Sequence, residues 1–441
     1  MKYDLYQYSK KITHQELVSK ILGMEKGFYL HVRDSGVSYF GFLPKLFFSS
    51  EKSEQRVLDF LSEILQEFIH EKKEKKETRF FTGGLVGYLS YDLGKHLYSI
   101  PSKIPDDLKT PDFALGLYES LVIFDHTTQY TWICSRSRKE KKKYLDWLER
   151  ETSCIEEPKL NPSQSHFNLT SNMSYEEYAK TFSKIRSHLY EGDIYQVNFA
   201  QRFSCDGPLI SKSGMAYKLG LEPHSAYLNF NDFEVFSFSP ERFLKVDSQR
   251  KILTQPIKGT VPRGVTKKEE EIFKKQLLSS EKDRAEHIMI VDLERNDVGK
   301  ICKPGTVKVP ELLQIKTFEK VHHLVSTIEG ELCSGITTMD IIDATFPGGS
   351  ITGAPKKRAM SIIEDLEPSR RGIYTGSIGY IDFSGELDMN IAIRTLIRTG
   401  NKNYFSVGGG IVVDSDPEKE FKETLVKGEM IVENLSSCSL K

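Results

Sequence analysis

The chain has almost no surplus of charge of either sign. Its 441 residues contain 61 lysines and arginines and 62 aspartates and glutamates, which gives a formal net charge of −1. No overall field therefore attracts nucleic acid or an anionic membrane. Two short basic runs, at 72–76 and 138–143, are mixed with glutamate, so we interpret them as solvated surfaces. We expect neither a nucleic-acid partner nor a membrane partner.

Long apolar runs and paired cysteines are also missing. No apolar run approaches the length that spans a bilayer, and the first residues, MKYDLYQYSKKITHQ, lack the apolar core of a signal peptide. The six cysteines are scattered without a CxxC pair, which argues against a zinc site and against a disulfide framework. These absences predict a reduced, cytoplasmic protein. There is also no HExxH motif, no GxGxxG after a strand and no Ser-His-Asp order.

The pattern of apolar residues divides the chain into two parts. Its length exceeds what one ordinary core serves. Residues 1–150 are predicted to be mixed α/β, and 172–435 form a second part. Between them, the apolar pattern lapses at 151–171, which we interpret as a linker. Hairpin patterns dominate and helical patterns lie between them, so the sequence predicts an α+β fold of antiparallel sheets with packed helices.

Several helices are marked by their caps and spacing. Ser53 is positioned to cap a helix that runs to Phe68. Ser174 and Glu177 form a capping box at the start of a helix with one apolar stripe. The segment 267–298 is predicted to be helical, and 417–435 is the last predicted helix.

One lysine lies in an unusual segment, Thr254–Gly264 (TQPIKGTVPRG). Proline, glycine and threonine predict a tight turn there, with Lys258 beside a glycine. A lysine on a rigid turn is either a pinned charge or a nucleophile. For an arbitrary lysine the more common case is a solvated loop residue, and spacing alone does not decide between them.

Three glutamates are candidate metal ligands. Glu420 and Glu423 are three residues apart on the last predicted helix, so they share a face. Glu286 lies in the mostly apolar AEHIMIVDL, where a carboxylate is costly unless it is paired or binds a metal. Ligation by carboxylates alone would select Mg²⁺. The simpler interpretation is salt bridges with neighbours such as Lys422 or Arg284.

Two glycine-rich segments and three polar residues complete the candidate set. GGSITGAP (348–355) leads into a helix and offers backbone amides to an anion, and Gly408–Gly410 lets the backbone approach a ligand. Arg394, between apolar residues of a predicted strand, requires a carboxylate, either of a ligand or of a side chain such as Asp388. Glu241 and His323 are candidates for proton transfer, although such a histidine is more often a satisfied core residue.

Taken together, these segments resemble the chorismate-utilising enzymes. The resemblance covers residues from about Asn172 to Glu433. It rests on GDIYQVNFAQRF, SPERF, PIKGT, AEHIMIVDLERND, VHHLVS, FPGGSITGAPK, YTGSIGY, NIAIRT and GGGIVVDSDPEKEFKET, nine motifs in matching order. FTGGLVGYLSYD, in residues 1–150, resembles the N-terminal region of the aminating members. The resemblance implies a large two-lobed fold in which antiparallel sheets face each other with helices outside.

Two positions distinguish the reactions within this family. Members that add water resemble GDIxKV, with a lysine as base, whereas this chain has Gln196 there. An amide cannot deprotonate water, so Gln196 argues against isochorismate and salicylate synthesis. Anthranilate synthases resemble PIAGT at the central turn, and aminodeoxychorismate synthases resemble PIKGT, which is the sequence around Lys258. The aminodeoxychorismate synthases, component I, are therefore the subfamily that this chain resembles. Anthranilate synthase component I and a non-catalytic chorismate-binding homologue are the alternatives.

The resemblance also implies roles for particular residues. Lys258 would attack the ring of chorismate, Glu241 would protonate the departing hydroxyl, and His323 would be a further catalytic or binding residue. Mg²⁺ would be held by Glu286, Glu420 and Glu423. The substrate-binding residues would be Gln196, Thr260, Thr352, Tyr374, Arg394, Gly408, Gly409 and Gly410.

The resemblance further implies partners. No cysteine lies in a GxCxG-like elbow, so ammonia would come from solution or from a separate glutamine amidotransferase subunit. The product would be 4-amino-4-deoxychorismate, on the route to 4-aminobenzoate and folate. Many relatives carry a tryptophan pocket in the N-terminal half. The feedback motif LLES is not evident near 34–50 here, which argues against feedback inhibition and leaves a bound tryptophan open.

Overall fold

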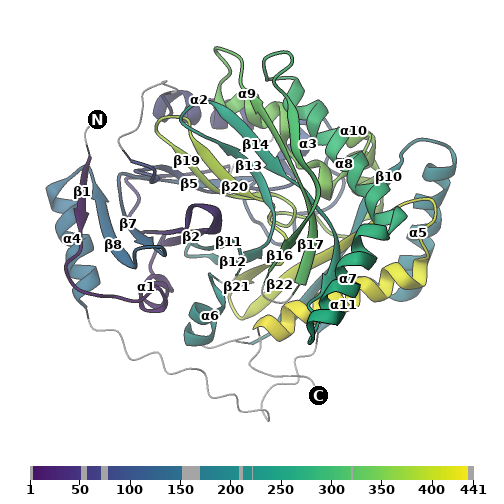
Figure 1. The fold of residues 1–441 in the computed structure, drawn as a ribbon, viewed down its shortest axis with the longest axis horizontal. Helices are drawn as coiled ribbons and strands as arrows, with labels where there is room; N and C mark the ends of the chain where they lie inside the picture. Colours follow the sequence, from purple (N-terminus) through teal and green to yellow (C-terminus); the bar gives the residue numbers. More distant parts are fainter. Residues whose placement is uncertain are drawn as a thin grey trace, which may run out of the picture.

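The computed structural model describes residues 3–50, 57–70, 78–150, 169–207, 212–220, 222–318 and 321–435. Two large antiparallel sheets form its centre, and the helices lie around them (Figure 1). This arrangement confirms the predicted α+β class with antiparallel sheets and packed helices. None of the helices in the described ranges is long and apolar enough to cross a membrane.

The first sheet has 12 strands in the order β1-β8-β7-β3-β2-β11-β12-β21-β22-β10-β18, and β9 pairs with β10 beside this path. Its strands are β1 (Asp4–Gln7), β2 (Phe28–Val32), β3 (Val37–Gly41), β7 (Ser120–Asp125), β8 (Tyr130–Ser135), β9 (Thr170–Ser171), β10 (Gln196–Asp206), β11 (His224–Asn229), β12 (Phe233–Ser239), β18 (Gly353–Ala354), β21 (Thr395–Thr399) and β22 (Lys402–Ile411).

The second sheet has 10 strands, with β15, β17, β14, β13, β20, β19, β5, β6 and β4 on its main path and β16 paired with β17. Its strands are β4 (Leu46–Ser49), β5 (Gly84–Leu89), β6 (Phe113–Tyr118), β13 (Arg242–Val246), β14 (Lys251–Gln255), β15 (Ile257–Pro262), β16 (Lys308–Thr317), β17 (Val321–Glu331), β19 (Ser377–Asp382) and β20 (Leu387–Asn390).

The two sheets pack face to face through aromatic side chains. Tyr39 of the first sheet meets Tyr380 of the second edge-on at 5.7 Å between ring centroids, and Phe28 meets Tyr118 at 4.6 Å. Phe28, Tyr39 and Tyr118 belong to one buried apolar cluster with members from both sheets, and Tyr380 packs against it. Burial of large aromatic side chains is the dominant favourable contribution to such an interface.

Both parts of the sequence contribute strands to both sheets. In the first sheet β2 pairs with β11, and in the second β5 pairs with β19. The segments 1–150 and 172–435 are therefore joined by backbone hydrogen bonds and do not form separate layers. Their division into two domains remains a prediction from the sequence. Most of the predicted linker, 151–168, lies outside the described residues, and its last two residues form β9.

The helices are α1 (His14–Ile21), α2 (Val57–Phe68), α3 (Leu93–Tyr98), α4 (Arg138–Glu149), α5 (Tyr175–Tyr190), α6 (Lys212–Lys218), α7 (Lys267–Ser279), α8 (Glu281–Gly299), α9 (Thr338–Thr345), α10 (Lys356–Leu366) and α11 (Pro417–Leu435). Helices α5, α7, α8, α10 and α11 lie together on the right in Figure 1, whereas α1 and α4 lie at the opposite end.

The helix predictions were correct where capping residues and helical spacing mark the ends of a helix. The capping box of Ser174 and Glu177 is present at the start of α5, and α11 has the predicted bounds. The segment 267–298 is helical as predicted, but it is divided into two helices, because Ser280 ends α7 and caps α8 through its hydroxyl. The predicted cap Ser53 lies outside the described residues.

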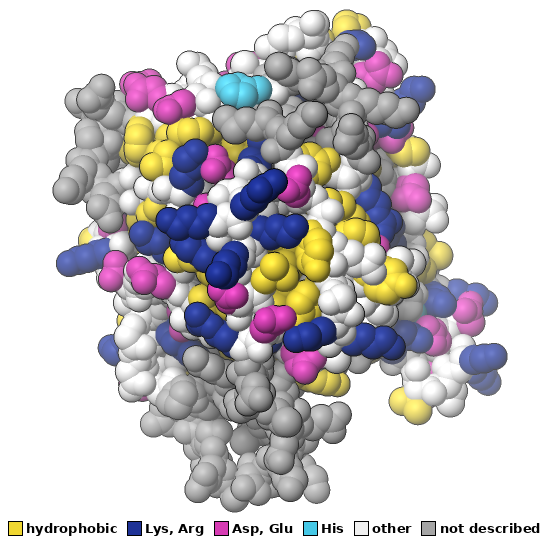
Figure 2. Space-filling view, turned by 90° about the vertical axis from the view of Figure 1, so that its left-hand side faces the viewer, with side chains coloured by type: hydrophobic (Ala, Val, Ile, Leu, Met, Phe, Trp, Pro, Cys, Tyr) yellow, Lys and Arg dark blue, Asp and Glu magenta, His cyan; other side chains and the backbone are white. Residues whose placement is uncertain are grey.

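The end of the molecule that carries α4 is shown in Figure 2. Lysines and arginines are spread over this face among acidic and apolar side chains. The basic run at 138–143 lies on α4, where Arg138, Lys139, Lys142 and Lys143 are exposed, as expected of a solvated surface. The run at 72–76 lies outside the described residues.

Candidate functional site

Lys258 lies in a strand and not in the tight turn that the sequence predicted. Strands β14 and β15 pair with successive stretches of β17, and Pro256 separates them. The register shifts between Lys258 and Thr260, at Gly259, whose φ is +70°. Proline removes a ladder hydrogen bond and glycine permits a bulge, so the segment is an interrupted strand. Such a bulge changes the direction in which the neighbouring side chain points.

Three side chains from different elements meet at the glycines of β22. A Cβ atom at Gly410 would lie 2.1 Å from Nε2 of Gln196 and 3.1 Å from Nζ of Lys258. A Cβ atom at Gly409 would lie 3.3 Å from Oε2 of Glu420. The absent side chains of these glycines thus make room for Lys258, Gln196 and Glu420. The sequence predicted backbone approach to a ligand here, and the structure shows three of the candidate side chains packed against that backbone.

Lys258 is largely buried and lies beside a carboxylate. Its Nζ is 3.8 Å from Oε2 of Glu286, and its side chain is 16% exposed. Burial lowers the pKa of Lys258, because the charged form loses hydration, and the nearby charge of Lys427 lowers it further. The charge of Glu286 acts in the opposite direction, and burial prevails. A larger fraction of this amine is therefore unprotonated at neutral pH than of an ordinary lysine.

Glu241 provides a buried carboxyl group that interacts with Lys258. It lies between β12 and β13, and its Oε1 accepts a hydrogen bond of 2.6 Å from Ser350. Burial raises the pKa of Glu241 to about 7, although Ser350, the N–H of Ile257 and the charge of Lys258 each lower it. About half of such groups carry a proton at pH 7, so Glu241 can donate one.

The three predicted metal ligands lie on α8 and α11, but they do not converge. Within the described residues, the one group of three potential ligands whose atoms all lie within 4.8 Å of one another consists of other residues. Glu420 is buried, and Glu423 is 54% exposed and pairs with Lys427 at 2.7 Å. The three glutamates do form salt bridges, as the simpler interpretation expected, but with other lysines than Lys422, which pairs with Glu418.

The donor set nevertheless fits a magnesium ion. Oε1 of Glu286 is buried and has no hydrogen-bond partner among the residues that the structure describes. Burial raises the pKa of Glu286, although the charges of Lys258 and Lys282 lower it, and the charge of Glu420 makes a smaller contribution that raises it. A buried, unsatisfied carboxylate oxygen that interacts with a second carboxylate is a site for a hard cation.

His323 and Thr260 face each other across β15 and β17. Thr260 Oγ1 and His323 Nδ1 are 2.8 Å apart, whereas Nε2 of His323 is buried without a partner among the described residues. Burial lowers the pKa of His323 to about 3, so its imidazole is neutral at physiological pH. One nitrogen of this ring is thus held by Thr260, and the other remains available.

Two of the predicted substrate-binding residues, Arg394 and Tyr374, lie in different surroundings. Arg394 precedes β21 with a φ of +50°, and its Nη1 is 3.4 Å from Oε1 of Glu222. Its suggested partner Asp388 instead forms a bidentate pair with Arg242. Tyr374 is buried with its ring 5.9 Å from the guanidinium of Arg371.

Thr352 contributes mainly to the shape of the loop before α10. Its hydroxyl donates to the carbonyl of Gly348, and its carbonyl accepts from the N–H of Asn198. The glycine-rich segment 348–355 forms a 3-10 turn at Gly349–Ile351 and the short strand β18 before α10.

The sequence prediction missed three residues that the structure brings to this site. Lys427 donates to the carbonyl of Gly408 and pairs with Glu423. Asn198 places a buried amide oxygen, without a partner among the described residues, against Gly408. Ser350 holds Glu241. Lys427 follows Glu423 by four residues on α11, so helical periodicity alone could have found it.

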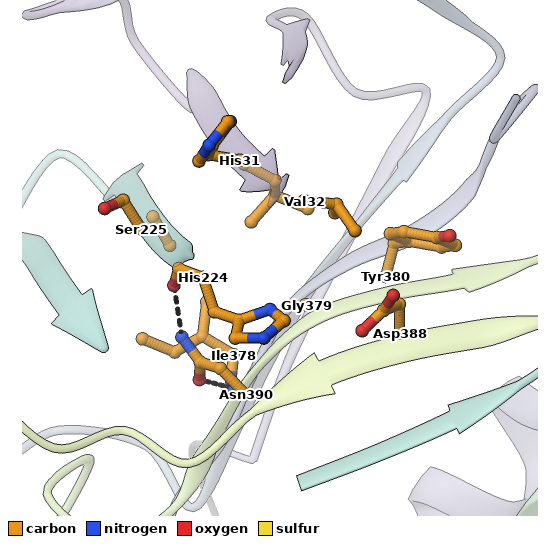
Figure 3. Close-up of a pocket in the computed structure, with 11 residues that line it drawn as sticks. His31, Val32, His224, Ser225, Ile378, Gly379, Tyr380, Asp388 and Asn390 are labelled. Carbon is orange, nitrogen blue, oxygen red and sulfur yellow. Dashed lines mark hydrogen bonds between the residues drawn. The ribbon is translucent and has the colours of Figure 1, made fainter. Parts of the chain in front are cut away.

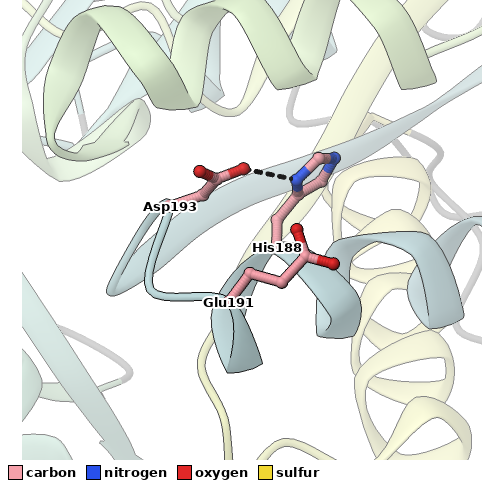
Figure 4. A group of neighbouring side chains, drawn as sticks. All are labelled: His188, Glu191 and Asp193. Carbon is pink, nitrogen blue, oxygen red and sulfur yellow. Dashed lines mark hydrogen bonds and ion pairs between the residues drawn. The ribbon is translucent and has the colours of Figure 1, made fainter.

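The group of potential ligands outside this site is His188, Glu191 and Asp193, at the end of α5 (Figure 4). His188 Nδ1 is 2.8 Å from Asp193 Oδ2, and Arg358 contacts the same carboxylate oxygen. An ordinary ion-pair network accounts for these contacts.

A small cavity lies between the two sheets, with a volume of about 10 Å³ (Figure 3). Strands β2, β11, β19 and β20 line it, and His31, His224, Asp388 and Asn390 provide its polar atoms. This volume holds about one water molecule. It does not hold an indole ring.

Known proteins are similar to this chain over most of its length. The family model of chorismate binding enzymes matches residues 25–433, and the chain belongs to this family. Among its relatives, aminodeoxychorismate synthase component 1 of Klebsiella aerogenes is 42% identical over 81% of this chain and 78% of that protein. Anthranilate synthase component 1 of Aquifex aeolicus is 38% identical over 85% of this chain and 78% of that protein.

Solved structures share the whole fold. Anthranilate synthase component I from Streptococcus pneumoniae superposes with a TM-score of 0.76 at 28% sequence identity, over 98% of this chain and 92% of that chain. The menaquinone-specific isochorismate synthase of Escherichia coli has the same TM-score of 0.76 at 18% identity, over 98% of this chain and 94% of that chain, and shows the fold alone. The expected fold of this family is thus confirmed.

Proposed function

We propose that the chain aminates chorismate to 4-amino-4-deoxychorismate, with Lys258 as the nucleophile. The observation that carries this proposal is the buried amine of Lys258, whose pKa is lowered by burial, between Gly410 and Glu286. The names of relatives such as the one in Klebsiella aerogenes support it. Chorismate is the substrate that the family implies.

In the first step, the unprotonated amine of Lys258 attacks the ring, and the double bond shifts as the C–O bond to the ring hydroxyl breaks. The neutral carboxyl group of Glu241 gives its proton to that hydroxyl, which leaves as water. Its pKa of about 7 and its hydrogen bond from Ser350 suit a donor at neutral pH. The result is a covalent adduct in which the nitrogen of Lys258 is a secondary ammonium group and Glu241 is a carboxylate.

In the second step, ammonia attacks the carbon that carried the hydroxyl, the double bond shifts back, and Lys258 leaves as a neutral amine, so the product carries the new ammonium group. Gln196 lies against Gly410 next to Lys258, and its Oε1 is buried without a partner among the described residues. This oxygen can accept a hydrogen bond from ammonia and orient it. It cannot act as a base toward water, which favours amination over hydration.

Other residues would position the substrate. Arg394 would bind the enolpyruvyl carboxylate in place of Glu222, with Tyr374 beside it. The ring carboxylate would lie near Gly408–Gly410, where the ammonium group of Lys427 adds a positive charge. Thr352 would shape the loop around it, and Thr260 would hold His323 in a tautomer that presents Nε2 to the ligand.

Glu286, Glu420 and Glu423 would hold Mg²⁺, with the closer approach of Glu423 requiring release of Lys427. The ion would neutralise the ring carboxylate of chorismate and favour its orientation. The unsatisfied Oε1 of Glu286 supports this assignment.

The relatives named component 1 imply a second component. We infer that it is a glutamine amidotransferase subunit that supplies ammonia. Tryptophan has no ready site at the cavity between the sheets, whose volume is about 10 Å³. Because the feedback motif LLES is also not evident near 34–50, we expect tryptophan at millimolar concentration to leave the activity unchanged.

One assay tests the reaction. The purified chain is incubated with chorismate, Mg²⁺ and an ammonium salt, and the products are identified by mass. We expect 4-amino-4-deoxychorismate from the wild type and almost none from Lys258→Ala. Anthranilate would favour the anthranilate synthase alternative, and isochorismate would exclude amination. Full turnover by Lys258→Ala would falsify the nucleophile role.

A further inference from the structure

A lysine lies between two of the three glutamates discussed above. Nζ of Lys282 is 3.5 Å from Oε1 of Glu420 on α11 and 4.0 Å from Oε1 of Glu286 on its own helix, α8. The same Oε1 of Glu286 has no hydrogen-bond partner among the described residues. An ammonium group thus stands between the two carboxylates without satisfying the buried oxygen.

The position of this lysine differs from that of an ordinary pair on a helix surface. Lys282 and Glu286 are four residues apart, with the lysine on the N-terminal side, which is the less favourable order for such a pair. Its shorter contact is with Glu420, across the gap between two helices. The two carboxylates are 13% and 9% exposed, so their charges require a nearby cation.

The ammonium group of Lys282 can also move away from the two carboxylates. Its side chain is 51% exposed, and a long lysine side chain reaches solvent by rotating its own bonds. An ion pair with this much exposure is weak, so a divalent cation of higher charge density can displace it. A lysine is suited to this exchange because its ammonium group is a compact charge on a flexible stem.

We propose that Lys282 occupies the place of the divalent cation between Glu286 and Glu420 and is displaced when Mg²⁺ binds. The inference rests on the proposed metal role of these glutamates. In the metal-free protein, Lys282 then compensates the negative charges of the two carboxylates. It competes directly with the metal for them. The affinity for Mg²⁺ is lower than the carboxylates alone would give.

The test measures metal binding without substrate. Mg²⁺ is titrated into the wild-type chain and into Lys282→Met by calorimetry, and Mn²⁺ binding is followed by electron paramagnetic resonance. We expect Lys282→Met to bind both ions about two- to fivefold more tightly, the ratio that corresponds to losing one exposed ion pair. Lys282→Arg keeps the charge, so it should not bind more tightly than the wild type.

Lys274→Met is the matched control, because Lys274 also pairs with glutamates three and four residues away, on the neighbouring helix α7. Its metal affinity should equal that of the wild type. Equal or weaker binding by Lys282→Met, with clear binding by the wild type, would overturn the competition alone. No binding by either protein would overturn both this inference and the proposed metal site. Binding as expected in a chain that does not aminate chorismate would overturn only the reaction.

Discussion

Glu241→Gln is the substitution whose effects the structure predicts most fully. The amide keeps the size of the side chain and can still accept a hydrogen bond from Ser350, but it has no acidic proton to give. Loss of a general acid usually costs about 10²–10⁴ in rate, or about 3–5 kcal/mol of transition-state stabilisation. We expect kcat for ammonia-dependent amination to fall by this factor.

The pH dependence provides a second, independent readout. Glu241 must be protonated to act, so the wild-type rate should fall as pH rises through its pKa of about 7. Lys258 must be unprotonated, so the rate should rise with pH through the lowered pKa of that amine. In Glu241→Gln the alkaline fall should vanish while the acidic rise remains.

At alkaline pH, Glu241→Gln should raise the stability of the fold, whereas it lowers the activity. The pKa of Glu241 is raised from 4.5 to about 7, so the folded state binds the proton more tightly than the unfolded state, and stability is lost as pH rises from about 4.5 to 7. At 1.36 kcal/mol per unit, the ionised group destabilises the fold by about 3 kcal/mol above pH 8. Glu241→Gln should therefore resist urea better than the wild type at pH 8 and no better at pH 4.5. If the rate of amination by Glu241→Gln still fell at alkaline pH as it does in the wild type, the assignment of Glu241 as the proton donor would be refuted.

Three further substitutions test other parts of the structure. Gly410→Ala places a Cβ atom 2.1 Å from Nε2 of Gln196, so amination should be lost while circular dichroism and the melting temperature change little; full activity would contradict the convergence at this glycine. Asp388→Ala leaves the buried guanidinium of Arg242 without its bidentate partner, and unfolding in urea should show a loss of about 3–5 kcal/mol. Burial lowers the pKa of His31 well below 6.5, so the stability of the wild type should fall as pH drops below about 6.5. His31→Asn should lose less stability than the wild type between pH 7 and 5. An equal loss of stability in both proteins would exclude His31 as the source of this pH dependence.

The sequence predicted what depends on neighbouring residues. The capping box at Ser174 and the bounds of α11 rest on contacts within four residues, and the structure has both. The break at Ser280 was missed because the apolar pattern continues through it, and only the cap geometry reveals two helices. The interruption of the strand around Lys258 looked like a turn because proline and glycine mark both.

The arrangement of the site depends on contacts that no local pattern contains. Lys282 reaches Glu420 across 138 residues of sequence, and Lys258 lies near Gln196 only because both side chains reach Gly410. The pairing of Arg394 with Glu222 and of Arg242 with Asp388 likewise required the fold.

The interleaving of the two sequence parts has a consequence during synthesis. Strands β2 and β5 leave the ribosome early, but their partners β11 and β19 follow much later in the chain. At about 5–20 residues per second, the nascent β5 waits on the order of half a minute for β19. Until then its edge and its apolar face are open to pairing with other chains. Chaperones that shield unpaired strands should therefore raise the yield of this protein more than that of one whose domains are contiguous in sequence.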